Sequence, residues 1–425
     1  MSWRVPGRRT RERLVVVGNG PAGMRTVEEL VARAPDHYDI TIFGAEPRQP
    51  YNRILLSAVL SGEKTGDDIV THSQAWHEER GIALIAGDTV VAIDPGRRSI
   101  ATASGIEMSY DKLLLATGSK PVMLPVPGLT LPGVTAFRDM SDVETQIAAA
   151  GDGRRAVVIG GGLLGLEAAW GLKQRGMAVT VVHLMPTLME RQLDATAAGL
   201  LQRDLAARGI DFLTSAETEE IIGRDKAEGV RLADGRELSA DLIVMAIGTR
   251  PNTDLARAAG LDVNRGLLVG DDMRTDDPSI YAVGECIEHN GQTFGLVAPL
   301  WEQAKVCAAW LAGDHSAAYQ PPPLYTSLKI TGVDMFSVGA IAAADDADDL
   351  VTLSDAASGV YRKLVLRGDR LVGCVLYGDV RDGPWYVELI QNATDTTPWR
   401  DHLIFGRAAA GMIADEPVPA AAKAA

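Results

Sequence analysis

The sequence is short of cysteine and of positive charge, it has no long uncharged apolar run, and each of these shortages argues against a class of function. Its three cysteines, Cys286, Cys307 and Cys374, stand far apart. No C-x-x-C pair or metal-ligand spacing results, so we expect no metal site and a reducing, cytoplasmic setting. The net charge of −15 argues against a nucleic-acid partner, because phosphates are neutralised by basic surfaces. No uncharged apolar run reaches the roughly 18 residues of a membrane span, so no membrane partner is expected.

Two glycine-rich motifs follow short apolar strands, VVVGNGPAGMRTVEEL early in the chain and VVIGGGLLGLEAA near its middle. Both have the spacing G-x-G-x-x-G. In this motif the first glycine permits a tight turn, the second lets a pyrophosphate approach the backbone, and the third lets helix and strand pack closely. Because both motifs lie between a strand and a helix, the sequence predicts two dinucleotide sites in one chain. The glycines are Gly18, Gly20 and Gly23 in the first motif, and Gly160, Gly162 and Gly165 in the second.

The rest of the chain supports two copies of one fold. The strand ends ATG (116–118) and IGT (247–249) occupy equivalent places in the two units. We therefore predict an α/β protein with two Rossmann-like dinucleotide-binding domains and a C-terminal α+β domain. Two dinucleotides imply a relay, for which a tightly held flavin and a dissociable nicotinamide are the natural pair. The expected boundaries are 12–122 and 247–319 for the flavin domain, 123–246 for the nicotinamide domain and 325–413 for the third domain, with flexible tails at 1–11 and 414–425.

An acidic residue after the second strand of such a unit usually binds the adenosine ribose. Glu46 takes this place in the first unit, but His183 takes it in the second. An acid there would repel a 2′-phosphate and favour NADH. Without it, His183 and Arg191 could accept a phosphate, while a neutral histidine could equally bond a free hydroxyl. The sequence therefore leaves NADH and NADPH open.

The motifs VVVGNGPAG, LLLATGSKP, VVIGGGLLGLEAA, AIGTRPNTDLA and TDDPSIYAVGECIE occur in this order. The order resembles that of the two-dinucleotide flavoprotein reductases of the glutathione-reductase-like superfamily. The segments PYNRILLSAVLSGE, VVHLMPTLMERQLD and KITGVDMFSVG point to one branch. They are similar to the flavin portion of assimilatory NAD(P)H nitrite reductase large subunits and to the electron-transfer subunits of assimilatory nitrate reductases. The resemblance covers nearly the whole chain apart from its two ends.

The resemblance implies FAD at the first glycine loop and NAD(P)H at the second. A helix N-terminus around 299–302 would face the flavin pyrimidine edge and stabilise the anionic reduced flavin. For Trp301, packing within that helix is equally expected. The implied FAD residues are Gly18, Gly20, Ala22, Gly23, Glu46, Arg53, Thr117, Gly118, Gly284, Glu285, Leu300 and Trp301; those for NAD(P)H are Gly160, Gly162, Leu164, Gly165, Glu167, His183, Arg191 and Gly248.

Disulfide reductases of this superfamily need a cysteine pair beside the flavin, but the matching segment here, YNRILLSAVL, carries Ser57 and Ala58. Thiol chemistry is therefore not expected. The ferredoxin-reductase branch usually has a lysine at the place of Ala58, paired with a glutamate on the second glycine-loop helix. This chain keeps that glutamate, Glu167, which we expect to contact the nicotinamide amide or to lie at a packed domain interface. No catalytic acid or base is required, because stacking positions the two rings for hydride transfer.

Nitrite reductases of this kind continue into iron–sulfur and sirohaem domains that this sequence does not contain. We therefore expect the chain to pass electrons from NAD(P)H through FAD to a separate iron–sulfur, molybdenum or sirohaem protein of nitrate or nitrite assimilation. The alternatives are a ferredoxin or rubredoxin reductase, including one that serves an oxygenase, and a flavoprotein whose third domain is mainly a docking module. A monomer and a homodimer are both compatible with the sequence.

Overall fold

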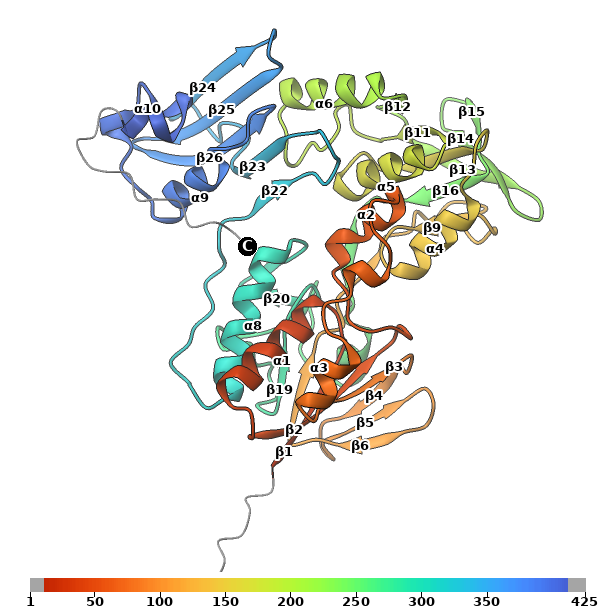
Figure 1. Ribbon diagram of the computed structural model, residues 1–425, viewed down its shortest axis with the longest axis vertical. Helices are drawn as coiled ribbons and strands as arrows, with labels where there is room; N and C mark the ends of the chain where they lie inside the picture. The colour runs from red at the N-terminus through yellow and green to blue at the C-terminus, as the bar shows by residue number, and fades with distance from the viewer. Residues whose placement is uncertain (1–10, 412–425) are drawn as a thin grey trace, which may run out of the picture.

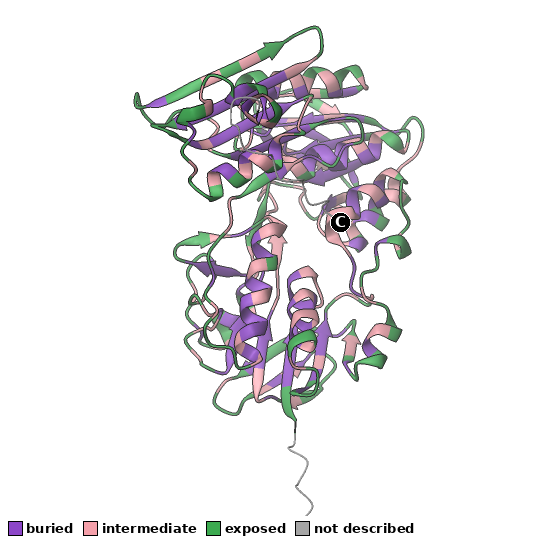
Figure 2. Cartoon of the chain, turned by 60° about the vertical axis from the view of Figure 1, so that its left-hand side comes forward, coloured by how far each residue is buried: buried purple, intermediate pink, exposed green. Residues whose placement is uncertain are grey.

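The computed structural model describes residues 11–411 and contains two α/β domains and a C-terminal domain (Figure 1). The expected tails lie outside the described residues except for Arg11, whose guanidinium pairs with Asp36. Within 11–411, none of the helices combines the length and the apolar character that crossing a bilayer requires. Buried positions follow the strands and the inner faces of the helices (Figure 2).

The first domain contains a five-stranded parallel sheet with strand order β19-β7-β1-β2-β3. Its central strand β1 ends in a continuous apolar run, as expected of a parallel strand that is buried on both faces. Helices α1 and α8 pack against each other beside it. The chain leaves this sheet after β7 and returns at β19, so two separate segments build it. The elements are β1 (Glu12–Val17), α1 (Pro21–Arg33), β2 (Tyr38–Gly44), β3 (Ala83–Ala86), β7 (Lys112–Leu115), β19 (Ile280–Ala282) and α8 (Val297–Leu311).

The second domain repeats the design with a parallel sheet in the order β12-β11-β10-β16-β9. Its central strand β10 and the neighbouring β11 and β16 are again almost wholly apolar and buried. The two segments where the chain crosses between the domains, β8 (Ser119–Pro121) and β17 (Thr249–Pro251), pair with each other antiparallel. The elements are β9 (Val134–Ala136), α4 (Met140–Ala149), β10 (Arg155–Ile159), α5 (Leu163–Gln174), β11 (Ala178–Val182), α6 (Ala195–Ala207), β12 (Ile210–Leu213) and β16 (Leu242–Met245).

The C-terminal domain is a five-stranded antiparallel sheet in the order β22-β23-β26-β25-β24, with helix α9 packed against β26 and β23. The predicted fold class, two Rossmann-type domains and a C-terminal α+β domain, is confirmed. Figure 1 shows this domain beside helix α6 of the second domain. The elements are β22 (Tyr325–Ser327), β23 (Met335–Gly339), β24 (Asp348–Asp355), β25 (Val360–Arg367), β26 (Arg370–Tyr377), α9 (Gly383–Gln391) and α10 (Arg407–Gly411).

Smaller elements complete the two α/β domains. The sheets β4-β5-β6 and β13-β14-β15 are antiparallel, while β18-β20-β21 is mixed. Helix α2 belongs to the first domain but packs against α5 of the second. These elements are α2 (Leu56–Ser61), α3 (Gln74–Glu79), β4 (Val90–Asp94), β5 (Ser99–Thr102), β6 (Glu107–Ser109), β13 (Thr218–Gly223), β14 (Ala227–Leu232), β15 (Glu237–Ser239), α7 (Asp254–Ala258), β18 (Leu267–Leu268), β20 (Ile287–His289) and β21 (Gln292–Thr293).

Polar contacts fix the C-terminal sheet to helix α6. Asp194 is the N-cap of α6, where one carboxylate oxygen accepts a hydrogen bond from the Ala197 N–H at 3.0 Å. Its other oxygen accepts from the Tyr361 hydroxyl at 2.6 Å and from Lys363 Nζ at 3.0 Å, both on β25. The Asp194 and Lys363 side chains are only 15% and 10% exposed, so the ion pair is largely shielded from water. Apolar residues of both domains form one core around it.

Replacing Asp194 by alanine tests this attachment. Asp194→Ala removes a helix cap and leaves the shielded Lys363 ammonium without its partner, so we expect the free energy of unfolding to fall by about 2–3 kcal/mol. Asp211→Ala is the matched control, because Asp211 is an exposed residue of β12 in the same domain. Urea unfolding of both variants measures the difference, and equal losses would contradict the role given to the Asp194 contacts.

Candidate functional site

The first glycine loop forms a cradle at the end of β1. Gly18 has a φ of +113°, and a Cβ atom there would lie 2.2 Å from the Ala116 carbonyl oxygen. A Cβ atom on Gly23 would lie 2.4 Å from the Gly18 oxygen, so helix α1 touches the turn itself. Gly20 differs, because its φ of −74° and ψ of 178° suit any residue and only Arg53 Nε lies within 4 Å of a Cβ atom there. The space beside Gly20 is therefore left open for a ligand.

The second glycine loop repeats this geometry. A Cβ atom would lie 2.3 Å from the Ala246 oxygen at Gly160 and 1.9 Å from the Gly160 oxygen at Gly165. At Gly162 it would meet nothing within 4 Å. Both Gly20 and Gly162 are helix N-caps without a side-chain hydrogen bond, so the first-turn N–H groups of α1 and α5 have no capping side chain. Uncapped N–H groups at a helix start, with space in front, fit the pyrophosphate of a dinucleotide.

A cavity of about 960 Å³ runs from the first loop to the C-terminal domain. It brings together most of the residues expected at the flavin and also reaches α5 and β22. Its lining includes Gly18, Gly20, Ala22, Glu46, Arg53, Thr117, Gly118, Leu164, Glu167, Gly284, Glu285 and Leu300. The other predicted residues lie outside the lining: Gly23, Gly160, Gly162, Gly165, His183, Arg191, Gly248 and Trp301. Gly23 and Gly165 instead pack helix against turn, and Trp301 is 36% exposed.

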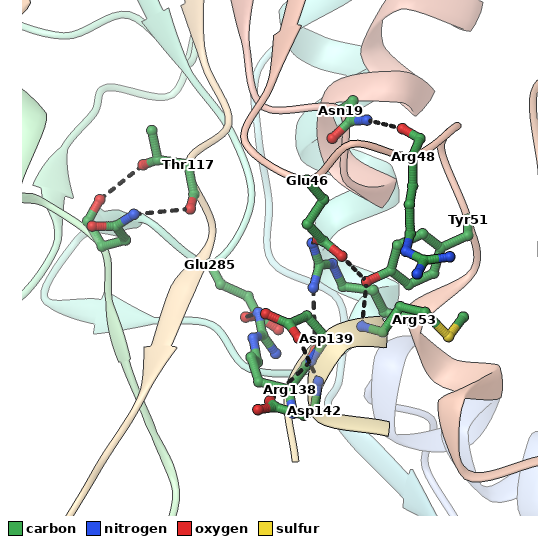
Figure 3. A network of polar contacts seen from close by, with 12 residues as sticks. Asn19, Glu46, Arg48, Tyr51, Arg53, Thr117, Arg138, Asp139, Asp142 and Glu285 are labelled. Carbon is green, nitrogen blue, oxygen red and sulfur yellow. Dashed lines mark hydrogen bonds and ion pairs between the residues drawn. The ribbon is translucent and has the colours of Figure 1, made fainter. Parts of the chain in front are cut away.

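Four charged side chains that line the cavity form two ion pairs (Figure 3). Glu46 forms an ion pair with Arg53 and accepts a hydrogen bond from the Tyr51 hydroxyl at 2.7 Å. Glu285 forms an ion pair with Arg138 and accepts from the Ser119 hydroxyl at 2.6 Å. Two guanidinium groups therefore lie in the cavity with the first loop, where they can contact a diphosphate.

Arg138 is the residue that sequence reasoning missed. It follows β9 of the second domain, outside every motif, yet its side chain reaches Glu285 of the first domain. The only signal in the sequence is a basic residue immediately before the N-cap Asp139 of α4. That position says nothing about the first domain, so only the fold reveals the contact.

Glu167 joins the cavity to the C-terminal domain. It lies on α5, is 7% exposed and accepts a hydrogen bond from the Lys329 backbone N–H at 3.0 Å. Burial raises the pKa of the Glu167 carboxyl to about 7, although hydrogen bonds from Lys329 and Ser57 act in the opposite direction. Glu167 thus contacts the segment between β22 and β23 of the C-terminal domain, and the same side chain lines the cavity.

His183 is built into the second glycine loop. Its ring is 10% exposed, and its Nδ1 accepts a hydrogen bond from the Gly161 N–H at 3.1 Å. Its Nε2 lies 3.1 Å from both the Thr187 carbonyl oxygen and Glu190 Oε2. Arg191 is exposed and makes no ion pair or hydrogen bond with the described residues. The structure thus brings His183 and Glu190 together, with Arg191 the next residue along the chain.

Comparison with known proteins explains this combination of two glycine loops and one cavity. Residues 12–309 match the family of pyridine nucleotide-disulphide oxidoreductases. The chain belongs to this family. Residues 325–394 match the C-terminal domain of rubredoxin NAD⁺ reductase. Membership in the pyridine nucleotide-disulphide oxidoreductases confirms the expected superfamily, and with it the use of FAD and a nicotinamide nucleotide.

Curated relatives narrow the branch. A nitrite reductase [NAD(P)H] of Bacillus subtilis is 49% identical over 91% of this chain and 48% of its own length. The assimilatory nitrate reductase electron transfer subunit of the same organism is 46% identical, over 88% of this chain and 48% of its own length. The chain therefore spans about half the length of these relatives. A chain in the crystal structure of the covalent putidaredoxin reductase–putidaredoxin complex superposes with a TM-score of 0.83 at 26% identity, covering 91% of this chain and 94% of that one.

The open space at Gly20 generates one prediction. Gly20→Ala has an acceptable backbone conformation and no protein clash, so we expect a stability change below about 1 kcal/mol but at least about tenfold weaker FAD binding. Gly18→Ala is the contrasting variant, because its Cβ atom collides with Ala116 and should destabilise the fold by about 2–3 kcal/mol. Flavin fluorescence and urea unfolding separate the two effects. Unchanged FAD affinity in Gly20→Ala would contradict the cradle.

The raised pKa of Glu167 leads to a second prediction, about how stability depends on pH. A carboxyl whose pKa is higher in the folded than in the unfolded state stabilises the fold below the unfolded pKa, and this contribution disappears as pH rises through about 7. Between about pH 5 and about pH 8, the free energy of unfolding should therefore fall by about 2–3 kcal/mol more in the wild type than in Glu167→Gln. Urea unfolding of both proteins across this pH range measures the difference. Parallel pH profiles for the wild type and Glu167→Gln would contradict the raised pKa.

Proposed function

We propose that the chain is a flavin-dependent reductase that takes reducing equivalents from NAD(P)H and passes electrons to a redox partner of nitrate or nitrite assimilation. The observation that carries this proposal is the pair of uncapped glycine-loop helix starts joined by one large cavity. The first loop opens into the cavity, and helix α5 of the second loop contributes Leu164 and Glu167 to its wall. Two dinucleotides held in this way would meet within one chain.

FAD occupies the cavity of the first domain in this proposal. Gly20 and the start of α1 bind the diphosphate, Arg53 and Arg138 neutralise it, and Glu46 binds the adenosine ribose. Glu285 binds the ribityl chain. When bound, a flavin supplies the chemistry that accepts a hydride from a nicotinamide and releases its electrons one at a time. Glu46 is paired with Arg53 and Glu285 with Arg138 before FAD binds. FAD binding therefore exchanges two existing ion pairs for contacts with the cofactor, and it does not have to remove water from two free charges.

In this proposal Gly162 and the start of α5 would hold the diphosphate of NAD(P)H, and Glu167 on the same helix would contact the nicotinamide amide. Gly160 and Gly165 shape the turn, and Gly248, with a φ of +117° and nothing within 4 Å of a Cβ atom, leaves space at the neighbouring strand end. Glu167 is anchored by the Lys329 N–H, which holds its carboxyl at the cavity wall. The residues thus position the two rings, and no acid or base on the chain is needed for hydride transfer.

No cysteine lies among the residues that line the cavity. All three cysteines are buried and unpaired elsewhere in the described chain. Disulfide reduction needs a thiolate at the flavin, so we propose electron transfer to a protein acceptor instead. Unpaired thiols are also typical of a reducing compartment, which supports the cytoplasmic setting expected from the sequence.

Two observations favour a nitrate or nitrite reductase component as the acceptor: the 49% and 46% identical relatives, each matched over about half of its length. We propose that the chain corresponds to their NAD(P)H-oxidising half. The second candidate is a ferredoxin or rubredoxin, favoured by the C-terminal match to rubredoxin reductase and by the likeness to the putidaredoxin reductase complex. In both cases the acceptor contains a metal centre that takes single electrons.

Anaerobic titration of the FAD-loaded protein with NADH, and separately with NADPH, tests the proposal. We expect the flavin absorbance to bleach at one equivalent of the preferred nucleotide, because the proposal places one flavin in the cavity and no cysteine lines it. Absence of bleaching with either nucleotide would refute the function. Electron transfer rates to a sirohaem nitrite reductase module, a molybdenum nitrate reductase, a ferredoxin and a rubredoxin then rank the acceptors.

A further inference from the structure

We propose that Glu190, and not His183, is the ribose-binding acid of the second dinucleotide site, and that it selects NADH over NADPH. This inference rests on the proposed function, because it names the nucleotide that the second site takes. It concerns the loop 184–193, which connects β11 to α6 and lies outside the glycine motif.

The His183 ring has no nitrogen left for a ribose. Its Nδ1 accepts the Gly161 N–H, and a ring nitrogen that accepts carries no hydrogen. The single ring hydrogen is therefore on Nε2, which points at the Thr187 oxygen and at Glu190 Oε2. With 10% of the side chain exposed, His183 acts as a strut between the glycine loop and the loop 184–193.

The loop 184–193 folds back over the glycine loop and brings Glu190 to this place. Met189 has a φ of +51°, which reverses the chain, and its N–H donates to the Gly161 oxygen at 3.0 Å. A Cβ atom on Gly161 would lie 2.7 Å from Leu188 Cδ2 and 2.8 Å from His183 Cγ, so the loop lies directly on this glycine. Glu190 consequently lies beside the end of β11, although it is seven positions further along the chain than His183.

One oxygen of the Glu190 carboxylate is fixed by His183, and the other is free to bind a ligand. Oε2 lies 3.1 Å from His183 Nε2, while Oε1 has no hydrogen bond or ion pair with any described residue, and the side chain is 31% exposed. A free carboxylate oxygen can accept hydrogen bonds from ribose hydroxyls and repels a 2′-phosphate. In the first domain Glu46 follows β2 at the corresponding end of its sheet. Both domains therefore have an acidic side chain at this end of the sheet. In the first domain it comes just after the strand, and in the second it comes from a loop that folds back.

Arg191 would favour NADPH instead, because a guanidinium can bind a 2′-phosphate. Its side chain is exposed and has no partner among residues 11–411, whereas Glu190 is fixed by His183. A fixed group gives up less conformational entropy on binding than a free arginine side chain does. The observations therefore favour Glu190 as the discriminating residue.

Redox-inactive fragments of the two nucleotides provide the test. ADP-ribose and 2′-phospho-ADP-ribose are titrated by calorimetry into the FAD-loaded full-length chain, so that the first site is already filled. The variants are Glu190→Gln and Arg191→Gln. Glu228→Gln is the matched control, because Glu228 is an exposed carboxylate on β14 of the same domain. Steady-state measurements with NADH and NADPH accompany the binding data.

We expect the wild type to bind ADP-ribose more tightly than its 2′-phosphorylated form. Glu190→Gln should weaken ADP-ribose binding about tenfold or more, as loss of a hydrogen bond to a charged group does, and should strengthen binding of the phosphorylated fragment. Unchanged affinities in Glu190→Gln would overturn the inference. So would a wild type that prefers the phosphorylated fragment and loses that preference in Arg191→Gln. Failure of the wild type to bind NADH, NADPH or either fragment would instead refute the proposed function.

Discussion

The architecture depends on one steric constraint that occurs twice, the contact between the first and third glycines of each loop. A Cβ atom on Gly23 or Gly165 would stand 2.4 or 1.9 Å from the carbonyl oxygen of Gly18 or Gly160. Only this close approach lets α1 and α5 start at the carboxyl ends of β1 and β10, with their uncapped N–H groups facing outward. The cavity between the first loop and α5, with Leu164 and Glu167 in its wall, follows from where those two helices begin.

Much of the fold could be predicted because it depends on residues that are close together in the sequence. Strand, glycine turn and helix are contiguous in the sequence, so both loops, both Rossmann-like domains and the α+β third domain could be predicted without knowledge of long-range contacts. Glu46 was predictable for the same reason, because it follows β2 directly. The repeat of ATG and IGT strand ends likewise indicated that the second unit interrupts the first.

The rest depends on contacts that no motif encodes. Arg138 reaches Glu285 across a domain boundary, and its sequence neighbours belong to a helix cap of the other domain. The position of Glu190 depends on a reversed backbone at Met189 and on the bare surface of Gly161, neither of which has a spacing signature. Glu167 was placed on the correct helix, but its bond to the Lys329 N–H joins segments that only the tertiary fold brings together.

Burial of all three cysteines shields their thiols from oxidants in the folded chain. The side chains of Cys286, Cys307 and Cys374 are at most 1% exposed, and burial raises the pKa of each thiol, so little of the thiolate that reacts with oxidants is present or reachable. A reductase that keeps its electrons on a flavin loses no catalytic group to sulfenic acid formation. The electron transfer proposed for this chain would therefore not depend on a reactive thiol that oxidants can inactivate.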